Sequence, residues 1–149
     1  MTRAPFALLL LAITAVAQAD MGILGLGTWV QRNGVLVLTI EEAGAARKLT
    51  YRTRGPDGKF MKGELTLVTM GDGKDSPMLV DGKPSGQSLA IKKVDANHTL
   101  TVIRLNGKDC GTSRAEISAD GKVMKSEDEY NNPACGMVGK KTVNTWDKK

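Results

Sequence analysis

The chain has 149 residues, and its 21 lysines and arginines against 16 aspartates and glutamates give a formal net charge of +5. This length suits a single domain. Basic residues are interspersed with acidic ones and aromatic residues make up only 4% of the chain. The sequence therefore lacks the dense basic stripe and stacking aromatics of a nucleic-acid-binding surface, and we expect no nucleic-acid partner.

Residues 1–19 have the three parts of a secretory signal peptide. Arg3 gives a positive start, residues 6–16 form an apolar run, and residues 17–19 (Ala-Gln-Ala) give the small-x-small cleavage pattern. Eleven helical residues reach roughly 16 Å, much less than a bilayer core of about 30 Å. We therefore expect cleavage before Asp20, no membrane anchor afterwards, a net charge of +4 and a periplasmic or secreted protein.

Asn-Gly and Asp-Gly dipeptides punctuate the remaining chain. Two-residue hairpin turns need positive φ, which Asn, Asp and Gly tolerate. Such dipeptides between runs of alternating apolar residues are a strong hairpin signal. The six dipeptides therefore predict an antiparallel meander, and they begin at Asn33, Asp57, Asp72, Asp81, Asn106 and Asp120.

Between these turns, apolar residues recur at every second position, as at Leu36, Leu38 and Ile40. Such a period indicates strands with one face on a core and one in water. No segment after residue 19 has the pattern of a long helix. The predicted strands cover residues 27–31, 35–42, 46–54, 60–70, 76–80, 88–94, 99–106, 112–118, 122–130 and 141–147.

Ten short strands in consecutive hairpins leave two exposed sheet edges unless the sheet closes on itself. We therefore expect residues 20–149 to form one all-β domain, a single antiparallel up-and-down β-barrel of 8–10 strands. A β-sandwich is the alternative architecture. The uneven spacing of the turns does not suit a propeller, and we expect a monomer.

Short motifs along the chain carry a resemblance to a known family. Gly27-Thr28-Trp29 resembles the Gly-x-Trp with which lipocalins and related calycin barrels begin. Together with 57–59 (Asp-Gly-Lys), 72–75 (Asp-Gly-Lys-Asp), 117–122 (Ile-Ser-Ala-Asp-Gly-Lys) and 146–148 (Trp-Asp-Lys), it makes the chain similar to uncharacterised secreted lipocalin-like proteins of bacteria. The resemblance implies a lipocalin-like barrel closed at its bottom by the Trp29 indole, and it implies no established activity.

Cys110 and Cys135 are the only cysteines. An even number in an exported chain predicts a disulfide, which here would stabilise the fold by about 3–4 kcal/mol. The alternative is a pair of reactive or metal-binding thiols, for which CxxC spacing and a nearby histidine are missing. Residues 131–140 are predicted to be an irregular loop held by Cys135.

The sequence carries no catalytic or metal-binding signature. The only histidine, His98, falls in a predicted turn, where a solvated side chain is expected. Asp72 and Asp75 share a glycine-rich turn without the twelve-residue pattern of a calcium loop. Nucleophile-elbow, zinc-helix and phosphate-loop motifs are also missing. We therefore expect no enzyme, no cofactor and no metal site.

One face of the predicted strand 122–130 breaks the apolar pattern. Its other face is charged and suits solvent, so Ser126, Asp128 and Tyr130 should point into the barrel. Buried charges need partners, and Arg104 is the candidate partner of Asp128. One interpretation is a ligand pocket with a polar anchor. The other is a buried ion pair, or an open barrel end reached by water.

The leading functional hypothesis is a barrel that holds one small, partly apolar molecule, with no catalysis. The candidate binding residues are Tyr51, Arg104, Ser126, Asp128 and Tyr130. The alternative is a periplasmic protein-interaction module, such as an enzyme inhibitor or an envelope-associated factor. The basic charge argues against inhibition of lysozymes, which are often basic too. The predicted lining of the barrel interior is Leu36, Leu38, Tyr51, Leu65, Leu67, Ile91 and Val102.

Overall fold

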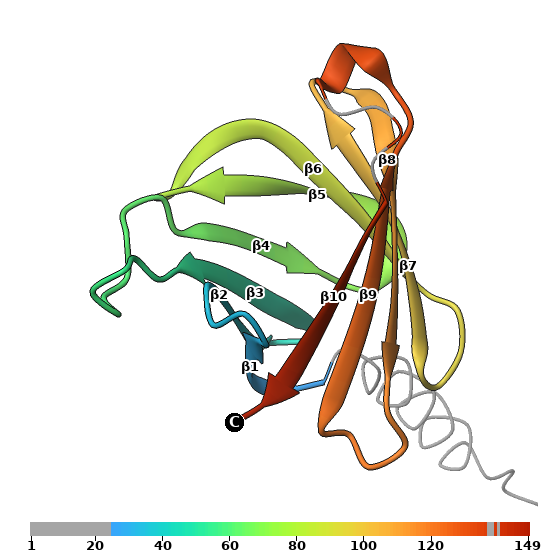
Figure 1. The fold of residues 1–149 in the computed structure, drawn as a ribbon. Coiled ribbons are helices and arrows are strands. Elements are labelled where there is room, and N and C mark those ends of the chain that lie inside the picture. The colour runs from blue at the N-terminus through green and yellow to red at the C-terminus, as the bar shows by residue number, and fades with distance from the viewer. Residues whose placement is uncertain (1–24, 137–138, 140) are drawn as a thin grey trace, which may run out of the picture.

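A computed structural model of the chain describes residues 25–136, 139 and 141–149, and the predicted signal peptide lies outside them. The described part folds into ten strands and one short 3-10 helix (Figure 1). These elements are β1 (Gly27–Gln31), β2 (Leu36–Ala43), β3 (Ala46–Thr53), β4 (Leu65–Thr69), β5 (Asp72–Val80), β6 (Lys83–Lys93), β7 (His98–Leu105), β8 (Lys108–Ile117), β9 (Val123–Tyr130), η1 (Pro133–Cys135) and β10 (Lys141–Lys148).

The ten strands form a closed antiparallel up-and-down barrel. Each strand pairs with the next along the chain, and β1 closes the sheet by pairing with β10. Closure leaves neither end of the sheet as a free edge. The prediction of an all-β up-and-down barrel of 8–10 strands is therefore confirmed, and the β-sandwich alternative is wrong.

Most predicted turns fall where the dipeptides place them. Asp81 and Gly82 join β5 to β6 with φ values of 49° and 81°, and Asn106 and Gly107 join β7 to β8 with 50° and 80°. Positive φ at both central residues is the backbone that these two-residue turns require. The exception is Asp72-Gly73, which lies inside β5 at a register shift rather than at a turn.

The region between β3 and β5 differs most from the prediction. The predicted strand 60–70 is reduced to β4, and residues 54–64 form a long loop whose one bridge joins Arg54 to Phe60. The chain turns at Gly71, with φ of 69°, so β5 begins earlier than predicted. Gly73, with φ of 84°, forms a bulge, a second structure that an Asp-Gly dipeptide suits.

Antiparallel connection puts the turns at two ends of the barrel. We call the end that holds Trp29 and the turn 118–122 the closed end, and the opposite end, with the loop 54–64 and η1, the open end. The Trp29 side chain is fully buried, its Nε1 donates to the Gly25 carbonyl at 3.0 Å, and the Lys148 Nζ lies 5.7 Å from the ring centroid. The indole thus occupies the closed end, as the resemblance implies.

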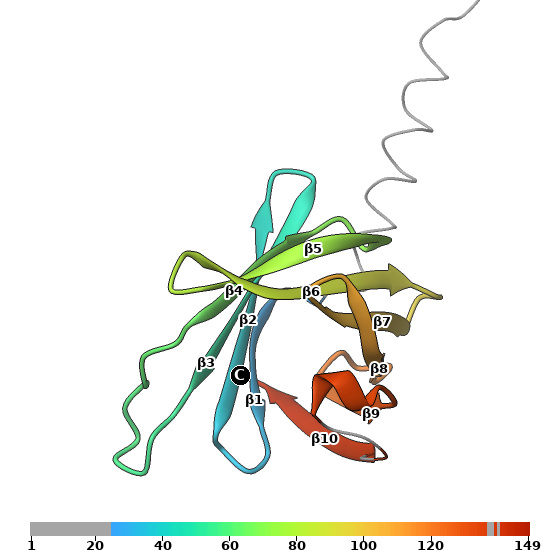
Figure 2. The same cartoon turned by 90° about the horizontal axis from the view of Figure 1, so that it is seen from above.

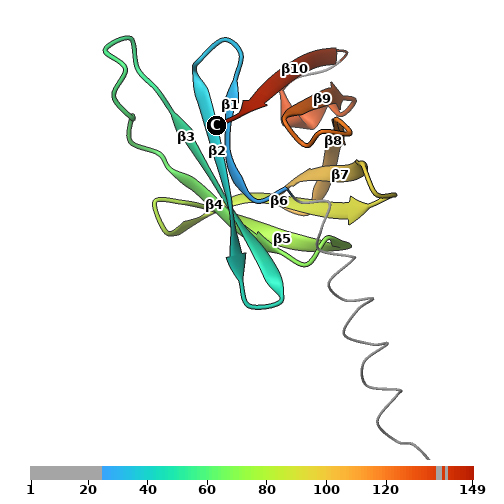
Figure 3. The ribbon, with the colours of Figure 1, turned by 90° about the horizontal axis from the view of Figure 1, so that it is seen from below.

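The seam between β1 and β10 is short. Its three residue pairs run from Trp29–Lys148 to Gln31–Trp146, and β10 then continues past β1 (Figures 2 and 3). Inside the seam, the Gln31 Nε2 donates to the Asn144 Oδ1 at 2.7 Å. Outside it, the Arg32 Nε lies 3.0 Å from the Asp147 Oδ2. Polar side chains therefore reinforce both faces of the closure.

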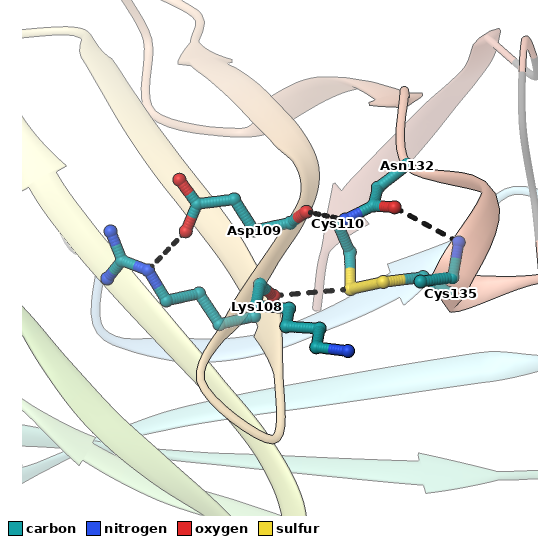
Figure 4. Close-up of a disulfide and its surroundings, with 7 residues drawn as sticks. Lys108, Asp109, Cys110, Asn132 and Cys135 are labelled. Atoms are coloured by element: carbon teal, nitrogen blue, oxygen red, sulfur yellow. Dashed lines mark hydrogen bonds and ion pairs between the residues drawn. A yellow bond between two sulfur atoms is a disulfide. The ribbon is translucent and has the colours of Figure 1, made fainter.

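A disulfide ties the open end together and confirms the predicted Cys110–Cys135 pairing. Cys110 begins the buried part of β8, and Cys135 ends η1. Asn132 caps this helix by accepting from the Ala134 amide, and its Nδ2 donates to the Asp109 carbonyl at 2.8 Å (Figure 4). The Asn131 amide also donates to the Cys110 carbonyl at 3.0 Å, so one covalent bond and two hydrogen bonds join the predicted irregular loop to β8.

Candidate functional site

Two adjoining cavities occupy the barrel interior, with volumes of about 280 and 220 Å³. Ligand pockets in proteins begin at about 300 Å³, so the pair suits one small molecule. We call this space the lumen. Both cavities are lined by Leu36, Tyr51, Ile91, Thr101, Ser113 and Asp128.

The lumen has two chemically different sides. The inward side chains of β2–β6 form a mainly apolar wall, in which Tyr51 and Gln87 are the polar lining residues. Its apolar lining residues are Leu36, Leu38, Ile40, Leu49, Leu65, Met78, Leu89 and Ile91. Oxygen and nitrogen atoms are concentrated on β7–β10, interspersed with Ile103, Ala115, Met124 and Trp146. This polar wall consists of Thr99, Thr101, Ser113, Ser126, Asp128 and Asn144.

Strand β9 supplies the core of the polar wall. Its period of two places Ser126, Asp128 and Tyr130 along the lumen, on the face that the sequence predicts. The Trp146 Nε1 donates to the Ser126 Oγ at 3.3 Å, and the Asn144 Nδ2 donates to the Asp128 Oδ2 at 3.5 Å. The second bond is long, so it satisfies the Asp128 carboxylate only weakly.

Two phenols of the lumen lie within the field of this carboxylate, Tyr51 on β3 and Tyr130 two residues further along β9. Burial, followed by the negative charge of Asp128, raises the pKa of Tyr51 to about 12. The same two causes raise the pKa of Tyr130, which is half-buried. Both phenols are therefore protonated at neutral pH. Within the described part of the chain neither hydroxyl has a hydrogen-bond partner, so both are open to a molecule in the lumen.

Arg104 is not in the lumen, and its predicted pairing with Asp128 is wrong. Its side chain is on the outer face of β7, where its Nε donates to the Asp109 Oδ1 at 2.6 Å and its Nη1 contacts Asp75. Val102 lies on the same outer face, because its neighbours Thr101 and Ile103 line the lumen.

Alternation along residues 99–106 cannot show which face of the strand points into the barrel. Apolar residues occur in both alternating sets, Leu100 with Val102 and, on the other side, Ile103. The pairing of Leu89 with Ile103 decides which set points inward. The other predicted lining residues are placed inside: Leu67 is buried in the core, and the remaining five line the cavities.

The sequence prediction missed several polar lumen residues, namely Gln31, Gln87, Thr99, Thr101, Ser113 and Asn144. Ser113 is two residues before the inward Ala115, and Asn144 is two before the buried Trp146. Residues two apart share a face of a strand, so the inward positions of Ala115 and Trp146 predict inward positions for Ser113 and Asn144. Pairing of Ser113 with Asp128 across β8 and β9 then brings the hydroxyl beside the carboxylate.

The only histidine is far from this site. His98 begins β7 at the closed end, with its Nδ1 2.7 Å from the Asp95 Oδ1 and its Nε2 3.6 Å from the Glu116 Oε1. The hydrogen bond with Asp95 raises the pKa of His98. Within the described ranges no three His, Cys, Asp or Glu side chains gather as metal ligands. His98, Asp95 and Glu116 are therefore not among the residues that line the lumen.

A second hollow lies on the outer face of β7–β10. It has a volume of about 600 Å³, and cross-strand pairing lines up Leu100, Arg114, Glu127 and Val143 along its floor. We call it the outer groove. Val143 is 65% exposed, and the basic and acidic side chains alternate across the strands. The groove therefore offers a mixed surface, whereas the lumen separates apolar from polar.

The chain matches no protein-family model, no curated protein and no solved structure. Its class therefore follows from the fold: a closed ten-stranded up-and-down β-barrel with a disulfide at its open end. No helix in the described residues is both long and apolar enough to span a membrane.

Proposed function

We propose that the protein is an exported, lipocalin-like barrel that binds one small, partly apolar molecule in its lumen without catalysis. The observation that carries this proposal is the pair of cavities of about 280 and 220 Å³ between an apolar and a polar wall. Apolar burial would give such a molecule most of its affinity, and a few directed polar groups would orient it.

The disulfide supports the exported part of this proposal. Disulfides persist in oxidising compartments such as the periplasm and are rare in the reducing cytosol. The Cys110–Cys135 bond thus agrees with the predicted signal peptide. Together they favour a periplasmic or secreted location.

Binding is proposed rather than catalysis because the lumen lacks the arrangement that general acid–base work requires. Such work usually pairs a carboxylate or a histidine with a second reacting group. His98 is outside the lumen, and the described neighbours of Asp128 are an amide, hydroxyls and phenols with raised pKa. This set can hold a polar group in a fixed orientation.

Native mass spectrometry of the exported protein tests the proposal, with thermal melting against a panel of lipids and metabolites. We expect copurified extra mass or a raised melting temperature. Ser113→Phe, which fills the lumen, should abolish this effect, whereas Thr112→Phe on the outer face should keep it. A protein that never carries extra mass and whose melting no compound changes would contradict the proposal.

The outer groove favours a second candidate function, a protein-interaction module. Its exposed Val94 and Val143 leave apolar surface at the rim of a hollow that also carries both signs of charge. Cross-linking in periplasm followed by pull-down tests this function. A stoichiometric partner lost in Val143→Asp but retained in Ser113→Phe would favour the groove over the lumen.

A further inference from the structure

Asp128 is the only residue with a formal charge at neutral pH among those that line the lumen in the described part of the chain. The other polar groups there are hydroxyls, phenols and amides. This contrasts with the chain as a whole, whose formal net charge is +5. None of the described lysines and arginines lines either cavity. A basic protein thus presents a single, partly buried negative charge to its lumen.

Among the described residues, no cationic side chain forms an ion pair with Asp128. The arginine that the sequence assigns to Asp128 is instead engaged outside the barrel by Asp75 and Asp109. The carboxylate accepts one long bond from Asn144, and its field raises the pKa of both phenols in the lumen. Asp128 is partly buried, and burial of a charge favours a partner of opposite sign or several good hydrogen bonds.

The groups around Asp128 can accept as well as donate. Ser113 lies opposite Asp128 across β8 and β9, and Thr101 and Ser113 line both cavities. A carboxylate together with hydroxyl oxygens matches the three N–H donors of an ammonium group. Leu36, Leu65 and Ile91 then lie across the lumen as a surface for an alkyl chain.

We propose that the molecule bound in the lumen is a small amphiphilic amine, whose ammonium group pairs with Asp128 and whose apolar part lies against the apolar wall of β2–β6. This inference rests on the proposed lumen-binding function and specifies the chemical class of its ligand. The interior charge selects against carboxylates of the same size, because like charges repel at short range.

The test compares octylamine, octan-1-ol and octanoic acid by titration calorimetry at pH 7, using the protein purified after export. These ligands share one alkyl chain and differ in the head group. We expect octylamine to bind at least about tenfold more tightly than octan-1-ol, because a hydrogen bond to a charged group exceeds a neutral one. Octanoate should bind most weakly.

Two variants with the same change of charge locate the effect. Asp128→Asn should lower the affinity for octylamine about tenfold to a hundredfold and leave the affinity for octan-1-ol unchanged. Glu129→Gln, on the exposed face of the same strand, should change neither affinity. Circular dichroism and thermal melting establish that both variants are folded.

The outcomes distinguish failure of the amine inference from failure of the proposed lumen-binding function. Equal or tighter binding of octan-1-ol or octanoate, or an unchanged affinity of Asp128→Asn for octylamine, overturns the amine inference and leaves lumen binding standing. Binding of none of the three ligands, with no ligand from the wider panel either, overturns both. The comparison of ligands on the wild-type protein decides the matter even if Asp128→Asn does not fold.

Discussion

The two ends of the barrel are packed in different ways. At the closed end, Trp29 fills the interior, and the cavity beside Ile40, Ile117 and Met124 has only about 30 Å³, roughly the liquid volume of one water. Toward the open end, the inward residues leave the lumen unfilled and its polar groups short of partners. The difference indicates that close packing at one end supplies stability while the other end retains a binding space.

The largest effect expected from this difference is at Trp29. Trp29→Ala removes a fully buried indole and should lower the free energy of unfolding by about 3–5 kcal/mol, measured by urea denaturation. Phe60→Ala is the matched change at the open end, where the ring is 47% exposed beside Arg52 and Arg54. It should cost less than about 1 kcal/mol. Equal losses would show that the ends do not differ.

The stability of the open end should depend instead on the Cys110–Cys135 disulfide. Cys110→Ser with Cys135→Ser should lower the free energy of unfolding by about 2–4 kcal/mol, because the unfolded chain regains the freedom of the loop that the bond closes. Urea denaturation of the oxidised and reduced wild-type protein provides the control. A double variant as stable as the oxidised protein would mean that packing alone holds η1 and β8 together.

The smallest effect is a change in the high-pH titration of the lumen. The folded pKa of Tyr51, about 12, exceeds its ordinary value of 10.0, so its contribution to stability is complete below pH 10 and is lost as the pH rises through 12. Absorbance near 295 nm follows both tyrosines. Asp128→Asn should lower the Tyr51 pKa part of the way, since burial is the larger cause. An unchanged titration in Asp128→Asn would place the carboxylate away from the phenol.

Strand positions were largely predictable, because alternation and turn dipeptides are local properties of the chain. The limits of β1 agree with the prediction, and those of β2 and β9 agree within one residue. The site was predictable where only one face of a strand suits solvent, as for Asp128 on β9. Arg104 was misplaced because both faces of β7 carry apolar residues, and the bulge at Gly73 was missed because Asp-Gly suits turns and bulges alike.

The seam between β1 and β10 constrains the order in which the barrel folds. Hairpins such as β5–β6 join residues close in sequence and can form early, whereas the bond from Gln31 to Asn144 spans 113 positions. Contacts between residues so far apart form slowly, because the chain entropy of a large loop is lost first. The lumen is therefore complete only when the last strand has joined the first.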